Sequence, residues 1–207
     1  MFIFGEVYSE VLKIASDMKK KENDYYFYGK LNIGFIIVPD SMADGKAYTY
    51  YAKLLNENGY TVIIANPSLF MRKEDYVAML IEKNPDIEKW YVIGHAQGGW
   101  AVSKLVAKQL EKLKGIAFLA SYIHEDISNY DISVIRILGS RDKVMNPSKK
   151  NENLEYLPEK STTMLILGGN YQGFIACDFR GKDGEASITW KEQQERSVKL
   201  ILEYFGL

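Results

Sequence analysis

The stretch that decides the fold is Trp90-Tyr91-Val92-Ile93-Gly94-His95-Ala96-Gln97-Gly98-Gly99-Trp100. Four apolar or aromatic residues run into Gly94, and two more glycines follow before an amphipathic run that reaches Leu113. A continuous apolar run that ends at a glycine is typical of a buried strand, and a run with a 3.6-residue period predicts a helix. The stretch therefore predicts a strand, a tight turn and a helix.

The glycine spacing around this turn matches the frame of a nucleophile elbow, in which a serine sits at the tip of a strained strand-to-helix turn. Gly94 and Gly98 lie two positions on either side of Ala96, where larger side chains would collide as the chain reverses. The central position should supply a nucleophilic oxygen or sulfur, but it holds Ala96. A methyl group has no lone pair, so Ala96 cannot attack a carbonyl carbon.

The composition is that of one soluble globular domain. The chain has 207 residues, of which 47% are hydrophobic and 26% charged. A net charge of −1 gives no electrostatic reason to expect binding to nucleic acid or to an anionic membrane. No stretch approaches the roughly 20 apolar residues that span a bilayer, and Glu6 and Glu10 interrupt the N-terminal apolar residues, which argues against a secretory signal.

Cysteine and histidine usage restricts the chemistry further. The single cysteine, Cys177, cannot form an internal disulfide, so we expect a reducing, cytoplasmic location. The two histidines, His95 and His124, are too few for a zinc site built on histidine, and we expect neither a metal nor another cofactor.

Periodicity along the chain predicts alternating strands and helices within one domain, 1–207, in which residues 1–24 form an N-terminal helix and linker. Asp44 is expected to cap a helix that Asn58 ends. The other expected helices cover 2–18, 72–83, 99–113, 147–154 and 190–205, and the expected strands cover 25–28, 33–38, 61–65, 90–94, 115–120, 132–138 and 164–167. This order indicates an α/β fold, a mostly parallel sheet with helices on both faces.

In such a sheet, binding sites form from the loops at the carboxyl ends of the strands. Those loops should therefore share one face of the molecule. They are 39–44, 94–98, 121–127, 139–145 and 168–175.

Two further motifs follow the elbow in order, Leu138-Gly139-Ser140-Arg141-Asp142 and Gly168-Gly169-Asn170. Together the three motifs resemble those of the α/β-hydrolase fold. The chain is most similar to its small members without a cap, the dienelactone-hydrolase-like group called alpha/beta hydrolase family 5. The resemblance covers roughly residues 31–205, including the closing segment 183–194, and implies an α/β-hydrolase fold with no cap domain.

Members of this family hydrolyse esters with a triad, in which serine attacks, histidine takes its proton and an acid orients the histidine. By this resemblance Asp142 holds the acid position, Ala96 the nucleophile position and Tyr171 the histidine position. The oxyanion loop corresponds to Pro39-Asp40-Ser41, where an acidic Asp40 would repel a developing oxyanion. Two of three triad members are therefore replaced, and the pair favours natural loss over an engineered serine-to-alanine inactivation.

Each candidate residue has a structural alternative. Asp142 has a structural alternative in which it is a relic of the triad and accepts a hydrogen bond from the Tyr171 hydroxyl. This alternative is favoured because tyrosine is a poor base at neutral pH and cannot replace the histidine. His95 is expected to pack rather than to catalyse, and His124 lies on a surface loop from which it could reach the pocket. Ser41 and Cys177 are substitute nucleophiles that lack an elbow and a base.

Aromatic and basic residues near these motifs have simpler interpretations. Tyr48, Tyr51 and Trp100 are expected to pack their helices rather than to bind a ligand. The lysines at 19–21 are expected to be a solvated helix end.

Two functions remain open from the sequence. The first is a protein related to small ester and lactone hydrolases that has no serine-hydrolase activity as written, unless an unusual residue restores it. The second is a non-catalytic module that binds a small ester, lactone or carbonyl ligand, or a partner protein, in the remnant pocket. Asp40, Ser41, Gln97 and His124 would contact the ligand. An exposed apolar face on the first or last helix would favour a homodimer.

Overall fold

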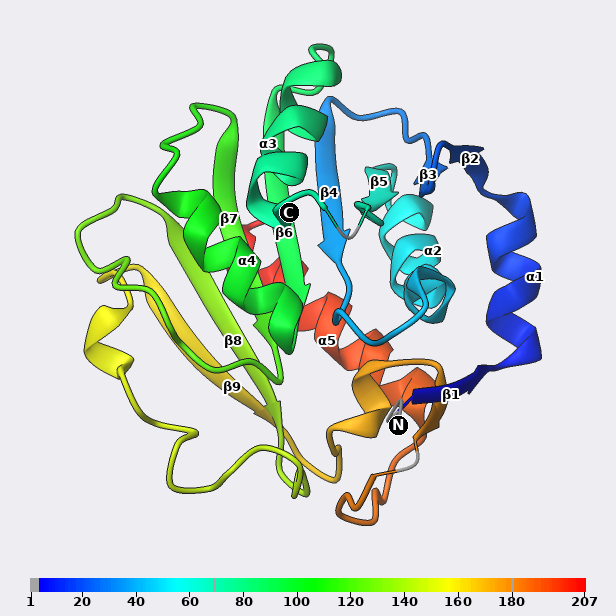
Figure 1. Ribbon diagram of the computed structural model, residues 1–207, viewed down its shortest axis with the longest axis vertical. Helices are drawn as coiled ribbons and strands as arrows, with labels where there is room; N and C mark the ends of the chain where they lie inside the picture. The colour runs from blue at the N-terminus through cyan, green and yellow to red at the C-terminus, as the bar shows by residue number, and fades with distance from the viewer. Residues whose placement is uncertain (1–3, 69, 180) are drawn as a thin grey trace.

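The computed structural model describes residues 4–68, 70–179 and 181–207, which form a central sheet with helices on both faces (Figure 1). The α-helices are α1 Ser9–Asp17, α2 Thr49–Glu57, α3 Lys73–Lys83, α4 Gln97–Val106 and α5 Trp190–Phe205. Short 3-10 helices cover Gly45–Tyr48, Leu154–Tyr156 and Gln172–Phe174. The strands are β1 Phe4–Val7, β2 Lys19–Lys21, β3 Asp24–Phe27, β4 Ile33–Val38, β5 Thr61–Ile64, β6 Lys89–His95, β7 Leu113–Leu119, β8 Ser133–Gly139, β9 Ser161–Ile166 and β10 Cys177–Phe179.

The central sheet has eight strands in the order β2-β3-β5-β4-β6-β7-β8-β9. Strand β3 is antiparallel to both of its neighbours, and every pair from β5 to β9 is parallel, which confirms the predicted fold class. The chain leaves β4 on one side to form β5 and crosses to the other side for β6. The loops after β4 and β6 therefore diverge, and a crevice opens between them at the carboxyl edge of the sheet.

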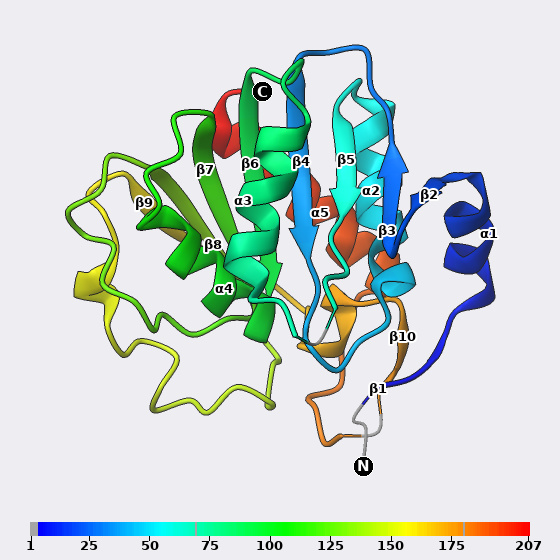
Figure 2. The same cartoon turned by 45° about the horizontal axis from the view of Figure 1, so that its top comes forward.

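Each central strand is buried on both faces because helices cover both (Figure 2). In β4, Phe35 and Ile37 pack in the cluster under α2 and α5, whereas Ile36 and Val38 pack in the cluster under α3 and α4. Side chains of a strand alternate between its faces, so a strand covered on both sides must be apolar throughout. This explains the continuous apolar runs in the sequence.

The N-terminal helix expected over 2–18 is wrong at its start. Phe4–Val7 forms β1, which pairs antiparallel with β10 in a separate two-stranded sheet, and residues 2 and 3 lie outside the described part of the chain. Only Ser9–Asp17 is helical, with Val11 and Ala15 buried. Pairing with a segment about 170 positions away overrides the local 3.6-residue pattern.

Four other expectations at element ends need correction. The lysines at 19–21 form the exposed edge strand β2 rather than a helix end, and charged edge strands resist unwanted pairing. The helix expected over 99–113 ends at Val106, because Leu113 begins β7 beside Trp90. Residues 147–153 form turns rather than a helix, and Leu154 begins a short 3-10 helix. The strand expected at 164–167 covers Ser161–Ile166.

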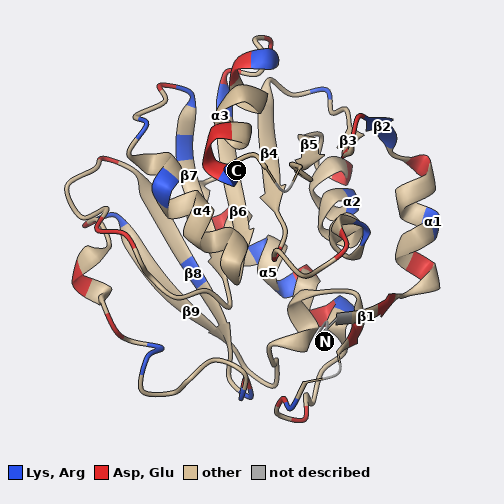
Figure 3. Cartoon of the chain, viewed as in Figure 1, with Lys and Arg blue, Asp and Glu red and all other residues tan. Residues whose placement is uncertain are grey.

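Charged residues of both signs are interspersed over the helices and loops, and β4 carries none (Figure 3). Within the described ranges, no helix combines the length and the apolar character that a membrane crossing requires. No cap domain covers the sheet edge in the described part of the chain. In the described part of the chain, the crevice is bounded by the loops at that edge, by the start of α4 and by β10.

Candidate functional site

The elbow turn keeps its geometry although its nucleophile is absent. Ala96, directly after β6, has φ 48° and ψ −114°, a region that a residue with a side chain rarely adopts. Its N–H donates to the Leu119 carbonyl at 3.0 Å, and its own carbonyl accepts from Gly99 N–H at 3.1 Å and from Ser121 Oγ at 2.9 Å. The surrounding hydrogen bonds therefore hold the strained conformation.

The flanking glycines are required by close packing, as their spacing predicts. A Cβ atom on Gly98 would lie 2.1 Å from the Val38 carbonyl oxygen, and one on Gly94 would lie 2.6 Å from Gly99 Cα. Both distances are far inside van der Waals contact. The turn can therefore approach β4 and its own helix only without side chains at these positions.

A cavity of about 200 Å³ lies above the elbow. It receives residues from all five loops that were expected to share one face, which confirms that expectation. Its lining is mostly aromatic and apolar, and consists of Asp40, Met42, Ala96, Gln97, Trp100, Ala120, Tyr122, His124, Val144, Met145, Tyr171 and Phe179. Ser41 is exposed and lines a neighbouring hollow between the loops after β4 and β5 instead.

Asp40 binds the hydrogen-bond donor that a substrate oxyanion would need. Its side chain is buried; Oδ1 accepts from Met42 N–H at 2.9 Å and Oδ2 accepts from Gln97 N–H at 3.2 Å. In an elbow hydrolase, the N–H of the residue after the nucleophile donates to the tetrahedral oxyanion. Gln97 is that residue here, and its N–H donates to the Asp40 carboxylate.

A buried chain of hydrogen bonds fixes the Asp40 backbone. Its N–H donates to the Tyr48 hydroxyl at 3.1 Å, and this hydroxyl lies 2.8 Å from His95 Nδ1. Lys73 Nζ donates to the Pro39 carbonyl at 2.8 Å. Burial lowers the Lys73 pKa, and the nearby Asp40 carboxylate opposes that change. The Asp40 backbone is thus fixed by hydrogen bonds to its own N–H and to the carbonyl of the preceding residue, Pro39.

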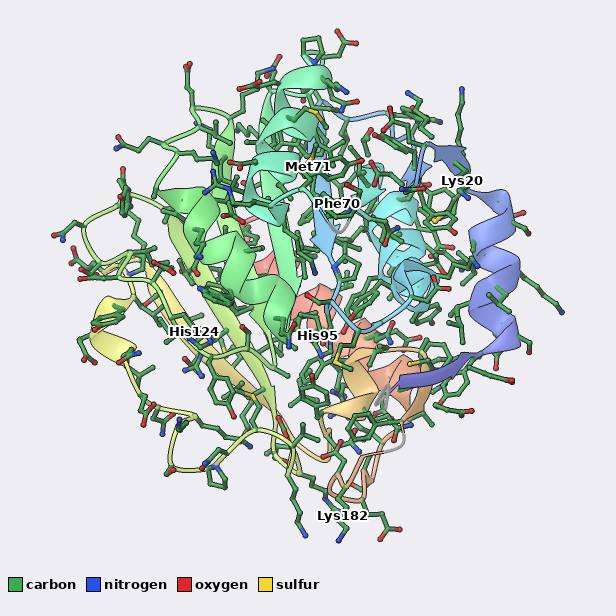
Figure 4. All side chains as sticks on the ribbon, viewed as in Figure 1. Lys20, Phe70, Met71, His95, His124 and Lys182 are labelled. Atoms are coloured by element: carbon green, nitrogen blue, oxygen red, sulfur yellow. The ribbon has the colours of Figure 1, made fainter. Side chains whose placement is uncertain are left out.

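His95 packs beneath the site rather than within it. It is fully buried and does not line the cavity, and its ring centroid lies 5.2 Å from that of Tyr171. Burial lowers the His95 pKa to about 4, against the opposing effect of Asp40, so the imidazole is neutral at pH 7. His124, in contrast, lies on the exposed loop after β7, where its ring is 5.4 Å from that of Trp100 (Figure 4).

The Asp142 carboxylate is held by its own loop. Oδ1 accepts from Val144 N–H at 2.8 Å and from Met145 N–H at 2.9 Å. Oδ2 is buried and has no hydrogen bond within the described ranges, with Lys150 Nζ 4.0 Å away. The expected hydrogen bond from Tyr171 is therefore wrong, because the turn after Asp142 supplies the donors. Burial raises the Asp142 pKa.

Tyr171 reaches the cavity from the loop after β9, and its side chain is buried. Burial raises the pKa of its hydroxyl far above the ordinary value, and the charges of Asp40 and Asp142 raise it further. The hydroxyl is therefore protonated at neutral pH and cannot act as a general base there. Tyr171, at the position where the resemblance places the catalytic histidine, therefore cannot replace the histidine as a base.

Cys177 is also unsuited to nucleophilic attack. It lies buried on β10, and burial raises the pKa of its thiol to about 12. A thiol becomes a nucleophile as its thiolate, which is negligible at neutral pH with such a pKa. Within the described residues, no group of three or more histidine, cysteine, aspartate or glutamate side chains could hold a metal ion.

Most of the aromatic residues that line the cavity were not predicted from the sequence. Trp100 is 45% exposed and lines the cavity, so the expectation that it packs its helix is wrong, whereas Tyr48 and Tyr51 are fully buried as expected. Tyr122 and Phe179 also line it. Its position in the sequence was the available signal, because Trp100 lies in the first turn of α4, close after the elbow that ends β6.

Comparison with known proteins supports the same fold. The model of the "Alpha/beta hydrolase family" matches residues 34–195. No curated protein matches the chain. Among solved structures, an α/β hydrolase enzyme from the metagenome of Mar Chica lagoon sediments in Morocco is 14% identical, with a TM-score of 0.69 over 91% of this chain and 97% of that one.

Two further solved structures are similar to a comparable degree. A monoacylglycerol lipase from Paleococcus ferrophilus is 13% identical, with a TM-score of 0.66 over 87% of this chain and 98% of that one. A predicted CIB-like hydrolase from Thermoplasma acidophilum is 13% identical, with a TM-score of 0.65 over 89% and 92% of the two chains. The family model covers most of the chain, and the strand order and elbow agree with it. This chain therefore belongs to the α/β-hydrolase family.

Proposed function

We propose that this chain is a non-catalytic member of its family that binds a small molecule in the cavity above the elbow. The hydrogen bond from Gln97 N–H to Asp40 carries the proposal, because it fills the site that stabilises the transition state of ester hydrolysis. Ala96 removes the nucleophile at the same point. Loss of a nucleophile or base alone typically lowers turnover by roughly 10⁶.

The proposal includes an ancestral chemistry, which membership of the α/β-hydrolase family supports only in general terms. The ancestor is a small ester or lactone hydrolase of the dienelactone type, and the present chain retains its elbow and its acid position at Asp142 without its reaction. The cavity supports a binding role because it is concave, mainly apolar and edged by a few polar groups, including Gln97 and the Tyr171 hydroxyl. A neutral carbonyl ligand or a cation would suit such a lining.

The competing function is hydrolysis through a substitute residue. The retained strain at Ala96 favours it, because strained backbone is concentrated at functional sites. The buried Cys177 thiol and the protonated Tyr171 count against it. The rim residue His124 carries the one imidazole among the described residues that line the cavity, so it is the side chain left as a substitute base.

Two assays separate these functions. A fluorophosphonate probe should not label the unmodified chain, and p-nitrophenyl acetate and a dienelactone should hydrolyse at the rate of a control without protein. The matched control is the His124→Gln variant, which should give the same background rates. Turnover well above background that His124→Gln abolishes would contradict the proposal and identify a substitute catalytic group.

A further inference from the structure

Four aromatic residues and one acid surround the cavity. Trp100 comes from α4, Tyr122 from the loop after β7, and Tyr171 and Phe179 from the segment between β9 and α5. Their rings form two walls: His124 lies between Trp100 and Tyr122, with ring centroids 5.4 and 6.1 Å from theirs, and the Tyr171 and Phe179 centroids are 5.7 Å apart. Aromatic faces carry negative electrostatic potential, so such walls attract cations.

The charged residue that lines the cavity is negative, as is the electrostatic potential at the faces of the aromatic rings. Asp40 is the only aspartate or glutamate among its described lining residues, and no lysine or arginine is among them. The nearby Lys73 donates to the Pro39 carbonyl and lines the neighbouring hollow instead. An anionic ligand would meet Asp40 at the place where the family normally binds an oxyanion, whereas a cation would be attracted.

The indole of Trp100 already attracts an ammonium group of the protein itself. Lys104 Nζ lies 4.4 Å from its ring centroid, outside the set of residues that line the cavity. The Trp100 Nε1–H donates to Glu125 Oε1 at 3.0 Å, which fixes the orientation of the ring. A fixed ring loses little conformational entropy when a ligand binds to it.

The polar groups of the cavity favour one type of cation. The Asp40 oxygens already accept from two N–H groups, and the Tyr122 hydroxyl accepts from Asn146 N–H at 2.6 Å. Primary ammonium ions need several hydrogen-bond acceptors when they leave water, whereas quaternary ammonium ions need none. The cavity of about 200 Å³ holds on the order of seven water volumes, which fits a head group of about seven non-hydrogen atoms.

From this combination of aromatic walls, a buried carboxylate and the cavity size, we infer that the cavity binds a small quaternary ammonium compound. The inference rests on the proposed function, since it assumes that the cavity serves binding rather than hydrolysis. It names the chemical class of the ligand, a methylated ammonium whose positive charge lies between the aromatic walls and Asp40.

Calorimetric titration with three probes of nearly equal shape tests the inference. Choline carries the charge, 3,3-dimethyl-1-butanol is its neutral carbon analogue, and glycine betaine adds a carboxylate. We expect choline to bind at least about tenfold more tightly than the neutral analogue, given the cation–π and charge contributions, and betaine to bind more weakly than choline. Equal or tighter binding of the neutral analogue would overturn the inference.

Variants assign the preference to the cavity. Asp40→Asn should lower the ratio of choline affinity to carbon-analogue affinity at least about threefold, and the aromatic rings should maintain the rest of the preference. Asp44→Asn, on the exposed part of the same loop, should leave this ratio unchanged. Trp100→Leu, at a side chain that is 45% exposed, should weaken choline binding about 2- to 30-fold, and tests the wall even if Asp40→Asn unfolds. An unchanged choline affinity in Trp100→Leu would overturn the inference.

The inference and the proposed function fail in different ways. If choline does not bind while the fluorophosphonate and ester assays stay at background, the ammonium assignment is wrong and the non-catalytic function stands. Ester turnover by the unmodified chain contradicts the proposed function, whatever the probes show.

Discussion

Asp40 should block catalysis even after the missing triad residues are restored. The double variant Ala96→Ser with Tyr171→His supplies a nucleophile and a base, and the buried Asp142 Oδ2, free of hydrogen bonds within the described ranges, can accept from the new imidazole. The Gln97 N–H would still donate to Asp40 Oδ2 at 3.2 Å. We therefore expect the double variant to remain a poor esterase, and the triple variant that adds Asp40→Gly to be much faster.

The structure sets the size of this difference. A substrate oxyanion at the Gln97 N–H would lie within about 4 Å of a retained Asp40 carboxylate, where two unit charges repel by about 4 kcal/mol at an effective dielectric constant of about 20. Loss of one oxyanion donor by itself costs about 10²–10³ in turnover. The triple variant should therefore exceed the double variant at least about 10²-fold in kcat/KM.

The assay is the initial rate of p-nitrophenyl acetate hydrolysis, with active sites counted by fluorophosphonate labelling. Asp40→Asn in the same background is the matched control, because it removes the charge and keeps an acceptor for Gln97 N–H. Its rate should fall between those of the double and triple variants. A double variant within tenfold of the triple variant would refute the assignment of Asp40 as the block.

Three further predictions concern stability, each measured by urea unfolding. Gly98→Ala should destabilise the fold by about 3 kcal/mol, because the new Cβ would lie 2.1 Å from the Val38 carbonyl oxygen. The control Gly206→Ala has open space around the new Cβ and should lose only about 1 kcal/mol, because of its φ of 68°. Equal losses in the two variants would contradict the steric argument. Tyr48→Phe should cost about 2–4 kcal/mol, because it leaves the buried Asp40 N–H and His95 Nδ1 without their partner; a loss below 1 kcal/mol would speak against the buried chain of hydrogen bonds. Burial raises the Asp142 pKa above its ordinary 3.8, so its contribution to stability is fully present below that pH and is lost as the pH rises through the folded-state pKa. Asp142→Asn should therefore gain stability relative to the unmodified chain between pH 3 and pH 7, and a difference that is constant with pH would exclude this linkage.

The parallel core could be predicted from the sequence because its determinants are local. The run Ile33–Val38 is apolar at every position, and only a strand buried on both faces requires that. Gly94 likewise encodes a local steric requirement, since a Cβ there would meet Gly99, whereas Gly98 is required by the approach of β4. Strand β1 could not be predicted, since its pairing with β10 depends on a segment about 170 positions away while its own residues fit a helical period.

The sequence predicts which loops form the site, but it does not predict which side chains of those loops touch one another. The strand order places Asp40, Ala96 and Tyr171 around one cavity, as the positions of the loops predict. The sequence indicates that Asp40 is acidic, yet not that its carboxylate turns back onto Gln97 N–H, which depends on the approach of the loop after β4 to the start of α4. The same limit applies to Trp100, because helical periodicity does not reveal which turn of a helix lines a cavity.

Packing and backbone hydrogen bonds hold Ala96 in its strained conformation. A residue in this region costs about 1–3 kcal/mol, and this chain gains no nucleophile from it. The cost is offset because Gly98 brings α4 into contact with the Val38 carbonyl and because the Ala96 backbone accepts from Ser121 and Gly99. A relaxed turn would break these contacts and move Gln97 N–H away from Asp40. The strained turn therefore still positions the Gln97 N–H as a donor, and this donor binds the Asp40 carboxylate.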